Sequence, residues 1–229
     1  KIKDRKLLIN KTYALQNNID FSQKNFFPLG GNSPLTSFSG RIISNGFKLS
    51  NISYTTTDVS GGAMYSGLIP LLTEGSIGNR NEPLVIENLQ LNCTFDSCGV
   101  VGGSNGGSIH VIVKNGFIQA SDSIANNLGG ILGSTASGTM DTELESSGFN
   151  GSIDASGVTN VGGLVGDISS SSVRAENNHV NLIDLKGSDR VGGMFGNVAI
   201  NINVDDSYVT LKGSVAGTTP DLGGLAGNV

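Results

Sequence analysis

The hydrophobic and polar positions along this chain alternate over short stretches, which is the pattern of β-strands with one buried face. The alternation recurs in the segments FIQAS, SIDASG, LIDLKG and YVTLKG, which begin at Phe117, Ser152, Leu182 and Tyr208. No stretch combines a 3.6-residue periodicity with a capping box and a run of helix formers. The pattern therefore predicts short strands along the chain, with helix as a minor component at most.

A six-residue phrase of the form apolar-Gly-Gly-apolar-apolar-Gly recurs between these segments. It reads LGGILG, VGGLVG, VGGMFG and LGGLAG, beginning at Leu128, Val161, Val191 and Leu222. The first glycines of the four copies follow one another at steps of 33, 30 and 31 residues. We align two weaker copies with them, one at Gly102 and Gly103 and one at Ser66 and Gly67. The repeat unit is therefore close to 30 residues long, with loops of variable length.

A repeat of this length fits a β-solenoid better than a β-propeller, because propeller blades have four strands and about 40 or more residues. We expect an all-β fold, a right-handed parallel β-helix of about six coils, with successive coils about 4.8 Å apart. A glycine-rich phosphate loop is excluded, because it needs a following helix and a single copy would suffice.

In such a stack, the same position of every repeat forms one column. Two columns of glycine are expected where the backbone bends tightly or where a neighbouring backbone comes close. These structural positions are Gly129, Gly130, Gly162, Gly163, Gly192, Gly193, Gly223 and Gly224. One residue of each following apolar pair is expected to face the core; the pairs are Ile131 with Leu132, Leu164 with Val165, and Met194 with Phe195.

The chain is expected to form a single structural domain. Residues 1–36 would cap the solenoid and supply its first strands, and residues 37–229 would form the repeats. Near the start of the repeats, a tight turn at Asn45 and Gly46 would join two short strands. Because Val229 directly follows the last glycine phrase, we expect either that the natural protein continues or that another subunit pairs with this end.

Composition narrows the class of protein. The chain has 34 glycines, no tryptophan, 37% apolar residues and a net charge of −5, which excludes disorder driven by charge repulsion. The acidic balance and the lack of a basic stripe argue against nucleic acid as a partner. The apolar stretches at 68–72 and 128–132 are far shorter than the roughly 20 residues of a membrane-spanning helix, so no transmembrane segment is expected.

The N-terminal part and the glycine phrases together resemble the GLUG-motif family of bacterial surface and secreted proteins. The matching residues are Tyr13, Leu15, Ile19, Asp20, Phe21, Asn25, Phe26, Pro28, Leu29, Gly30, Phe38, Gly40, Asn45, Gly46, Asn51 and Ile52, followed by the repeat at 161–166. The chain departs from the family at Ser44 and Asn45, where a longer Asp-Gly-Asn-Gly turn is usual, and SGLIPLL weakens the first repeat.

This resemblance implies a β-helical module like those of adhesins, autotransporter passengers and the non-catalytic regions of IgA-directed metallopeptidases. The peptidase part of such a protein would carry a His-Glu-x-x-His zinc motif on a helix. The histidines of this chain are His110 and His179, which lie far apart and lack that spacing. The resemblance is therefore specific to architecture and implies no catalytic activity.

Five carboxylates are candidates for glycoside hydrolysis, which needs two of them roughly 5 to 9.5 Å apart. They are Asp141, Glu143 and Glu145 in MDTELE, and Asp205 and Asp206 in NVDDSY. Alternation would place the first three on one strand face, about 7 Å from the first to the next. The same residues also suit a solvated outer face that keeps a sheet soluble, and we adopt this second interpretation.

No metal or cofactor is expected. Asp141, Asp154, Asp167 and Asp184 stand in unlike contexts and do not form the tandem repeat of a calcium-binding solenoid. His179, ahead of VNLID, is interpreted as an exposed residue at the end of a strand. No serine lies in a nucleophile elbow. We therefore predict no catalytic, cofactor-binding or metal-binding residues.

Cys93 and Cys98 in CTFDSC are the two cysteines of the chain. They are close enough to bridge a tight turn as a candidate disulfide, which would suit an oxidising compartment. The alternative is a pair of reduced thiols on one loop, whereas zinc would lack ligands. Four sequons begin at Asn10, Asn51, Asn92 and Asn150, as an Asn- and Ser-rich chain produces by chance.

Two insertions break the repeat, at residues 73–83 and 214–221, and solenoid insertions often carry recognition. The leading interpretation is a secreted or cell-surface structural and adhesive module. It would bind a protein or glycan ligand, or neighbouring copies of itself, through its loops and open ends. The alternatives are a carbohydrate-active β-helix enzyme and a subunit of a head-to-tail extracellular filament.

Overall fold

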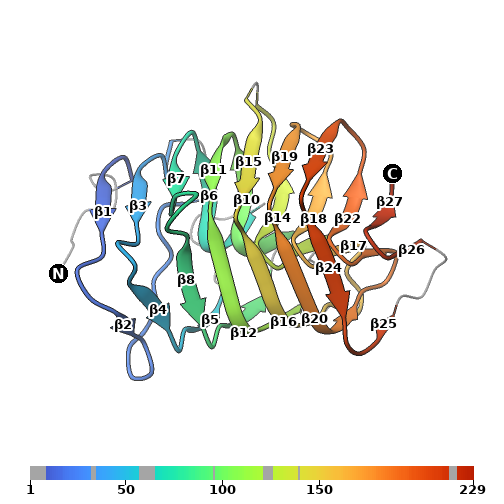
Figure 1. The fold of residues 1–229 in the computed structure, drawn as a ribbon, viewed down its shortest axis with the longest axis horizontal. Coiled ribbons are helices and arrows are strands. Elements are labelled where there is room, and N and C mark those ends of the chain that lie inside the picture. Colours follow the sequence, from blue (N-terminus) through green and yellow to red (C-terminus); the bar gives the residue numbers. More distant parts are fainter. Residues whose placement is uncertain are drawn as a thin grey trace.

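The computed structural model describes residues 9–31, 35–56, 65–94, 96–120, 126–138, 140–216 and 221–229. These residues form a β-solenoid of about six turns without a helix (Figure 1). Three sheets run along the long axis, and each bonded strand pair is parallel and joins successive turns. The predicted fold class, an all-β parallel β-solenoid, is confirmed.

Sheet A lies along the upper edge in Figure 1 and takes one strand from each turn. Its order is β1 (Thr12–Ala14), β3 (Arg41–Ile43), β7 (Ser76–Ile77), β11 (Gly107–Ile109), β15 (Thr142–Glu145), β19 (Val173–Glu176) and β23 (Ile202–Asp205). One inward residue of each strand is in register with the next, which gives a buried column of Ile42, Ile77, Ile109, Leu144 and Ala175. The column fills one side of the core.

Sheet B follows sheet A in each turn. Its order is β2 (Ile19–Asp20), β4 (Lys48–Ser50), β8 (Leu84–Glu87), β12 (Val111–Ala120), β16 (Gly148–Asp154), β20 (His179–Lys186) and β24 (Tyr208–Leu211), with β5 (Ser53–Thr55), β9 (Gln90–Cys93) and β25 (Val215–Ala216) completing the face. The tight turn at Asn45 and Gly46 connects β3 to β4. They belong to different sheets and do not pair with each other.

The repeating segments on sheet B are not all in the register that their sequences suggest. FIQ lies opposite SID, but Ile153 pairs with Leu185, which is the fourth residue of LIDLKG and not the second. Tyr208 pairs with His179, so YVTL lies opposite HVNL. The similar segments LIDLKG and YVTLKG are therefore not in register with each other. Alternation marks which face is buried, and both halves of sheet B carry it, so it does not identify the partner.

Sheet C forms the third face and carries the glycine phrases. Its order is β26 (Leu222–Gly223), β21 (Arg190–Gly192), β17 (Asn160–Gly162), β13 (Asn127–Gly129), β10 (Ser97–Asn105), β14 (Leu132–Thr135), β18 (Val165–Ile168), β22 (Phe195–Val198) and β27 (Ala226–Asn228), and β6 (Tyr65–Thr73) pairs with β10. The long strands β6 and β10 of earlier turns are thus replaced, in later turns, by two short strands, and the first of them ends on the first glycine of the doublet.

The doublets lie directly over one another. Gly129 pairs with Gly162, Gly162 with Gly192, and Gly192 with Gly223. A Cβ atom on Gly162 would overlap the carbonyl oxygen of Val165 and would lie 2.7 Å from the carbonyl oxygen of Met194 in the next turn. The glycines are therefore required by close backbone approach, which is one of the two reasons the sequence suggested.

The weaker glycine copies were aligned incorrectly. Ser66 pairs with Cys98 and Gly67 with Gly99, and Cys98 pairs with Leu128. Gly99 is thus the counterpart of the first doublet glycine, whereas Gly102 and Gly103 lie three and four residues further on. The visible doublet suggested the wrong position, because the long strand β10 has one glycine, Gly99, at the place of the later doublets, and its own doublet lies further along the strand.

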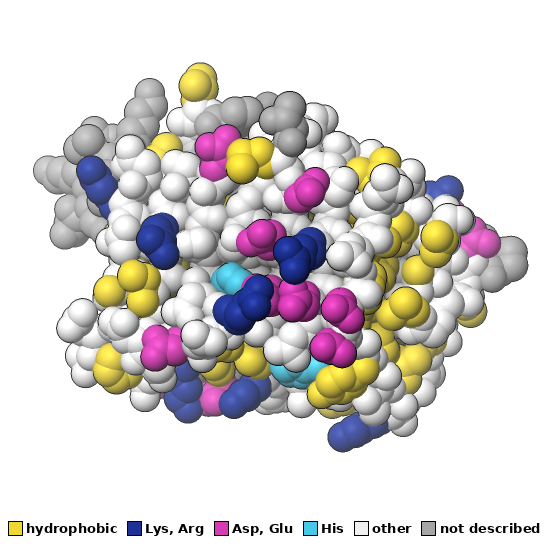
Figure 2. All heavy atoms as spheres, turned by 45° about the horizontal axis from the view of Figure 1, so that its top comes forward, with side chains coloured by type: hydrophobic (Ala, Val, Ile, Leu, Met, Phe, Trp, Pro, Cys, Tyr) yellow, Lys and Arg dark blue, Asp and Glu magenta, His cyan; other side chains and the backbone are white. Residues whose placement is uncertain are grey.

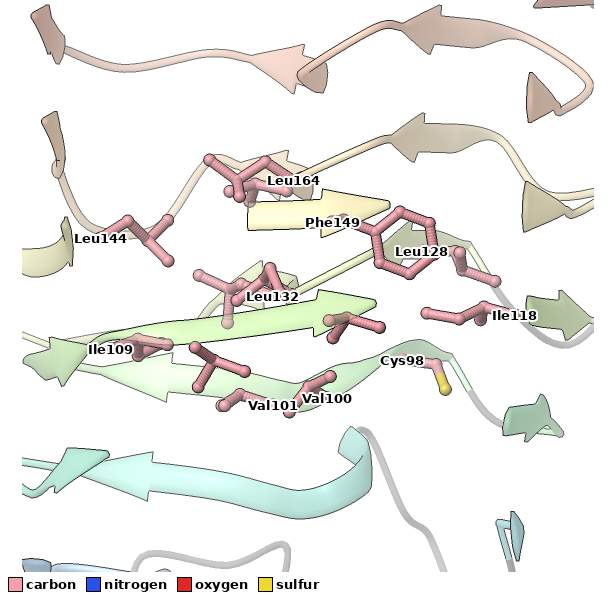
Figure 3. Packing of buried hydrophobic residues seen from close by; sticks show 14 of the residues in the cluster. Cys98, Val100, Val101, Ile109, Ile118, Leu128, Leu132, Leu144, Phe149 and Leu164 are labelled. Carbon is pink, nitrogen blue, oxygen red and sulfur yellow. The ribbon is translucent and has the colours of Figure 1, made fainter. Parts of the chain in front are cut away.

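Both residues of each apolar pair after the doublet are buried, although one was predicted. Their exposed fraction is at most 1% in Ile131, Leu132, Leu164, Val165, Met194 and Phe195. The step between the two short strands interrupts the alternation, so consecutive side chains can both reach the core. Figure 3 shows Leu132 and Leu164 among Ile109, Leu128, Leu144 and Phe149, which come from all three sheets.

The corner within sheet B is held by an asparagine ladder. Asn51, Asn88 and Asn115 all have left-handed backbone angles, with φ between 55° and 57°. Asn115 Nδ2 donates to Asn88 Oδ1 at 2.8 Å, and Asn88 Nδ2 donates to Asn51 Oδ1 at 2.9 Å. Asparagine tolerates this conformation better than most residues, and the stacked amides link three turns.

The corner between sheets B and C is closed by a disulfide between Cys93 and Cys98. Cys93 is the last residue of β9, Cys98 lies in β10, and both side chains are fully buried. Within the described residues there is no free cysteine. The bridge therefore cross-links two faces of the core inside one turn.

We expect Gly163→Ala to destabilise the fold by about 1–3 kcal/mol, because its Cβ would overlap the carbonyl oxygen of Gly193. Gly224→Ala is the matched control. It has the same place in the phrase, but a Cβ there meets nothing within 4 Å, and we expect a change within about 0.5 kcal/mol. Urea unfolding of the two variants measures both values. Equal destabilisation would contradict the close-approach argument.

Replacing both cysteines by alanine should lower the free energy of unfolding by roughly 2 kcal/mol, because a cross-link over a short loop restricts the unfolded chain. Thermal unfolding in the presence and absence of a reductant measures the effect. The melting temperature of the double variant should be the same with and without reductant. The native protein should melt at a lower temperature when reductant is present. A native protein that is insensitive even after denaturation in reductant would count against a stabilising disulfide.

Candidate ligand-binding face

The outer surface of sheet A carries an in-register ladder of side chains with opposite charges at its two ends. Arg41 pairs with Ser76, Ser76 with Ser108, and Ser108 with Glu143. Arg41 Nε donates to Ser76 Oγ at 3.3 Å, and Ser108 Oγ donates to Glu143 Oε2 at 2.8 Å. We call these four residues the Arg–Ser–Ser–Glu ladder.

A surface pocket of about 420 Å³ lies over this ladder. It is lined by Arg41, Glu74, Gly75, Ser76, Gly107, Ser108, Met140, Asp141 and Glu143. The hollow has a direct cause in the sequence: two successive turns place the short side chains of Ser76 and Ser108 at the position where the flanking turns have Arg41 and Glu143. The described part of the chain supplies no ion-pair partner for Glu74, Asp141 or Glu143.

Beside the ladder lies a second set, the acidic column of Glu145, Glu176 and Asp205. Glu145 pairs with Glu176, and Glu176 with Asp205, so their strands are about 4.8 Å apart. Two of the candidate carboxylates, Glu145 and Asp205, are thus brought to one column. Figure 2 shows acidic side chains gathered over the middle of this face, with Lys and Arg side chains among them.

Glu176 was missed in the sequence analysis, although the repeat contains the signal for it. It lies 31 residues after Glu145 and 29 before Asp205. Of the other candidates, Asp141 and Glu143 are exposed, and Asp206 is at the corner beyond β23 with a left-handed φ of 44°. Glu145 differs from Asp141 and Glu143, because its carboxylate is only 11% exposed.

The insertion at residues 73–83 positions the cation that covers this column. Its loop between β7 and β8 places Arg80 against the carboxylate of Glu145, and Arg80 Nη2 lies 3.9 Å from Glu176 Oε2. The hydrogen bond with Glu145 raises the pKa of Arg80 above its ordinary value. Arg174 Nη2 lies 3.0 Å from Glu176 Oε2. Two arginines therefore neutralise the N-terminal part of the acidic column.

The two histidines have separate roles. His110 is buried at the corner after β11, and its Nδ1 lies 2.8 Å from the carbonyl oxygen of Glu145. His179 is the first residue of β20, so it lies at the end of a strand as predicted. It is half-buried and not exposed as expected. Its ring stacks on that of Tyr208 with centroids 6.0 Å apart. Burial lowers the pKa of His179.

The aspartates considered for calcium lie apart. Asp141 lines the surface pocket, and the other three have protein partners. Asp154 pairs with Lys186 at 3.2 Å, Asp167 accepts from Asn197 at 2.7 Å, and Asp184 accepts from Ser214. Over the described ranges, no three His, Cys, Asp or Glu side chains gather closely enough to hold a metal ion. In the same residues there is no helix with the length and apolar character needed to cross a membrane. Part of the second insertion, residues 217–220, lies outside the described residues.

Comparisons with known proteins support the fold. No protein-family model matches the sequence, and no curated protein sequence is significantly similar to it. Among solved structures, the chain is similar to a protein from Bacteroides ovatus named a "putative immunoglobulin A1 protease". The TM-score is 0.52 and the sequence identity 16%, over 91% of this chain and 71% of that one. At this identity the likeness concerns the fold alone, and it defines the chain as a protein of the β-solenoid class.

Stability should fall as the pH drops below about 6.5, the ordinary pKa of histidine. Because burial disfavours the charged ring of His179, the unfolded chain takes up a proton at a higher pH than the folded chain does. The stability that this group contributes is present above the unfolded pKa and is lost on acidification. The variant His179→Phe keeps an aromatic ring but has no group that titrates here. Between pH 7.5 and 5.5, each about one unit from that pKa, it should lose less unfolding free energy than the native protein does. Identical losses in urea unfolding would contradict this role.

Proposed function

We propose that this chain is a secreted or cell-surface structural and adhesive β-solenoid module, and that it is not itself an enzyme. The observation that carries the proposal is the register of the turns. Each outward position recurs about 30 residues later in a straight column, as in the Arg–Ser–Ser–Glu ladder and the acidic column. Such columns make extended, regularly spaced surfaces, which suit the binding of a protein or glycan.

Two further features support an extracellular place. The Cys93–Cys98 disulfide is typical of proteins that fold in an oxidising compartment. The resemblance of the N-terminal part and the glycine phrases to the GLUG-motif family favours the same location. The fold likeness to a protein named as a protease agrees with a role as a non-catalytic region of a larger surface protein.

A carbohydrate-active enzyme is the second candidate, because the acidic column brings carboxylates to adjacent strands. Glu176 and Asp205 lie on strands about 4.8 Å apart, near the spacing that retaining glycosidases use. Against this candidate, Glu145 and Glu176 are both in contact with arginine. Release of reducing ends from acidic or neutral glycans, abolished by Glu176→Gln, would favour the enzyme over the module.

A filament subunit is the third candidate, because the last turns leave apolar side chains exposed. Tyr208, Leu211, Leu222 and Leu225 are between 39% and 57% exposed, and hydrophobic side chains gather toward this end in Figure 2. A further turn would cover them, whether it came from the same chain in a longer protein or from another copy. Light scattering that rises with concentration would favour the second source.

The location is tested by labelling intact cells that produce the protein with a membrane-impermeant amine reagent. We expect the exposed lysines of this chain to react without permeabilisation, to an extent similar to that of a known surface protein. A cytoplasmic protein in the same cells is the control for leakage. Labelling that appears only after permeabilisation would contradict the proposed location.

A further inference from the structure

The pocket on sheet A has opposite charges at its two ends, and the proposed adhesive function does not by itself explain this arrangement. Arg41 stands at its N-terminal end, and Glu143 and Asp141 stand at its C-terminal end. The two charged ends belong to one ladder, three strand steps apart, which is about 14 Å. At this distance the guanidinium and the carboxylates do not pair with each other.

Hydroxyl groups lie between the charged ends. Ser76 Oγ accepts a hydrogen bond from Arg41, so its own proton is available to an acceptor. Ser108 Oγ donates to Glu143, so its lone pairs remain available to a donor. The ladder in the floor of the pocket therefore offers, from its N-terminal to its C-terminal end, a cation, a donor, an acceptor and a carboxylate. Glu74, in the same turn as Ser76, adds a further carboxylate to the lining beside the ladder.

We propose that this pocket binds a short extended peptide with free termini, its carboxylate at Arg41 and its ammonium group at Asp141 and Glu143. An extended chain covers at most about 3.3–3.6 Å per residue, so four residues span the roughly 14 Å between the charged ends. This inference rests on the proposed function in one respect, which is that the module binds a ligand. It adds the chemical class of that ligand.

The lining favours a peptide over a glycan. It contains no aromatic ring on which a sugar could stack, but it does contain the exposed side chain of Met140, a flexible apolar group that adapts to varied side chains. The serines match the carbonyl and N–H groups of a peptide backbone. Gly75 and Gly107 allow the neighbouring backbone to come close, because a Cβ on either would lie 2.6 Å from a carbonyl oxygen of the preceding turn.

The test uses tetra-alanine, its N-acetylated form and its C-amidated form, with affinities measured by NMR titration of the whole chain. Blocking either terminus should weaken binding about tenfold, because each block removes one charge-assisted interaction. In Arg41→Gln, amidation should make no further difference. In the double variant Asp141→Asn with Glu143→Gln, acetylation should make no further difference, as expected when a block and a substitution remove the same contact.

Arg174→Gln and Asp205→Asn are the matched controls. Each removes one charge, positive and negative respectively, from the same face. Arg174 is the register neighbour of Glu143, but neither Arg174 nor Asp205 lines the pocket. Both should bind the free peptide as the native chain does, and circular dichroism confirms that each variant is folded. An equal loss in these controls would reduce the effect to general surface charge and overturn the proposal.

Three other results would overturn it as well. The first is equal affinity for free and blocked peptides. The second is no binding of tetra-alanine at 20 mM, which is about twentyfold above a millimolar dissociation constant. The third is binding of a zwitterionic tetrasaccharide in this pocket when peptides do not bind, which would assign a glycan instead. Cell-surface labelling is independent of these outcomes, so failure of the peptide site is distinguishable from failure of the proposed location.

Discussion

Parallel hydrogen bonding between successive turns is the constraint on which this structure depends. It requires each turn to lie about 4.8 Å from the next, along all three faces. On sheet C the chain must also step between two short strands within that spacing, so backbone atoms of the same and the following turn come against the Cα atoms of the doublet glycines. A Cβ at Gly162 or Gly163 would press against backbone atoms of the next turn and strain the spacing that the other two faces share.

The same register produces the surface chemistry. A charge placed on one strand of sheet A faces the equivalent residue of the next turn, whatever lies between them in sequence. Like charges then accumulate, as in Glu145 and Glu176, and Arg80 reaches across from the insertion to offset them. Where small residues recur instead, at Ser76 and Ser108, the column becomes a hollow. Binding surfaces on this solenoid are therefore combinations of columns.

Much of the architecture could be predicted from the repeat, but its details could not. The doublets at Gly129, Gly162, Gly192 and Gly223 are unambiguous, and the period gave the stack. In the degenerate copy, the doublet at Gly102 and Gly103 was aligned with the later doublets, but the register places Gly99 opposite the first glycine of the phrase. The carboxylates were recognised singly, and Glu176 was overlooked until the register placed it between Glu145 and Asp205.

By itself, the sequence determined that this protein is a β-solenoid with turns of about 30 residues. The reason is that only glycine can occupy a position where two backbones meet in every turn of the solenoid. It also identified Cys93 and Cys98 as near enough to bridge. Only the tertiary structure decided which residues share a column, because one residue more or less in a loop shifts every partner that follows. That is why the Arg–Ser–Ser–Glu ladder, drawn from four turns with loops of unequal length, is visible in three dimensions and not along the chain.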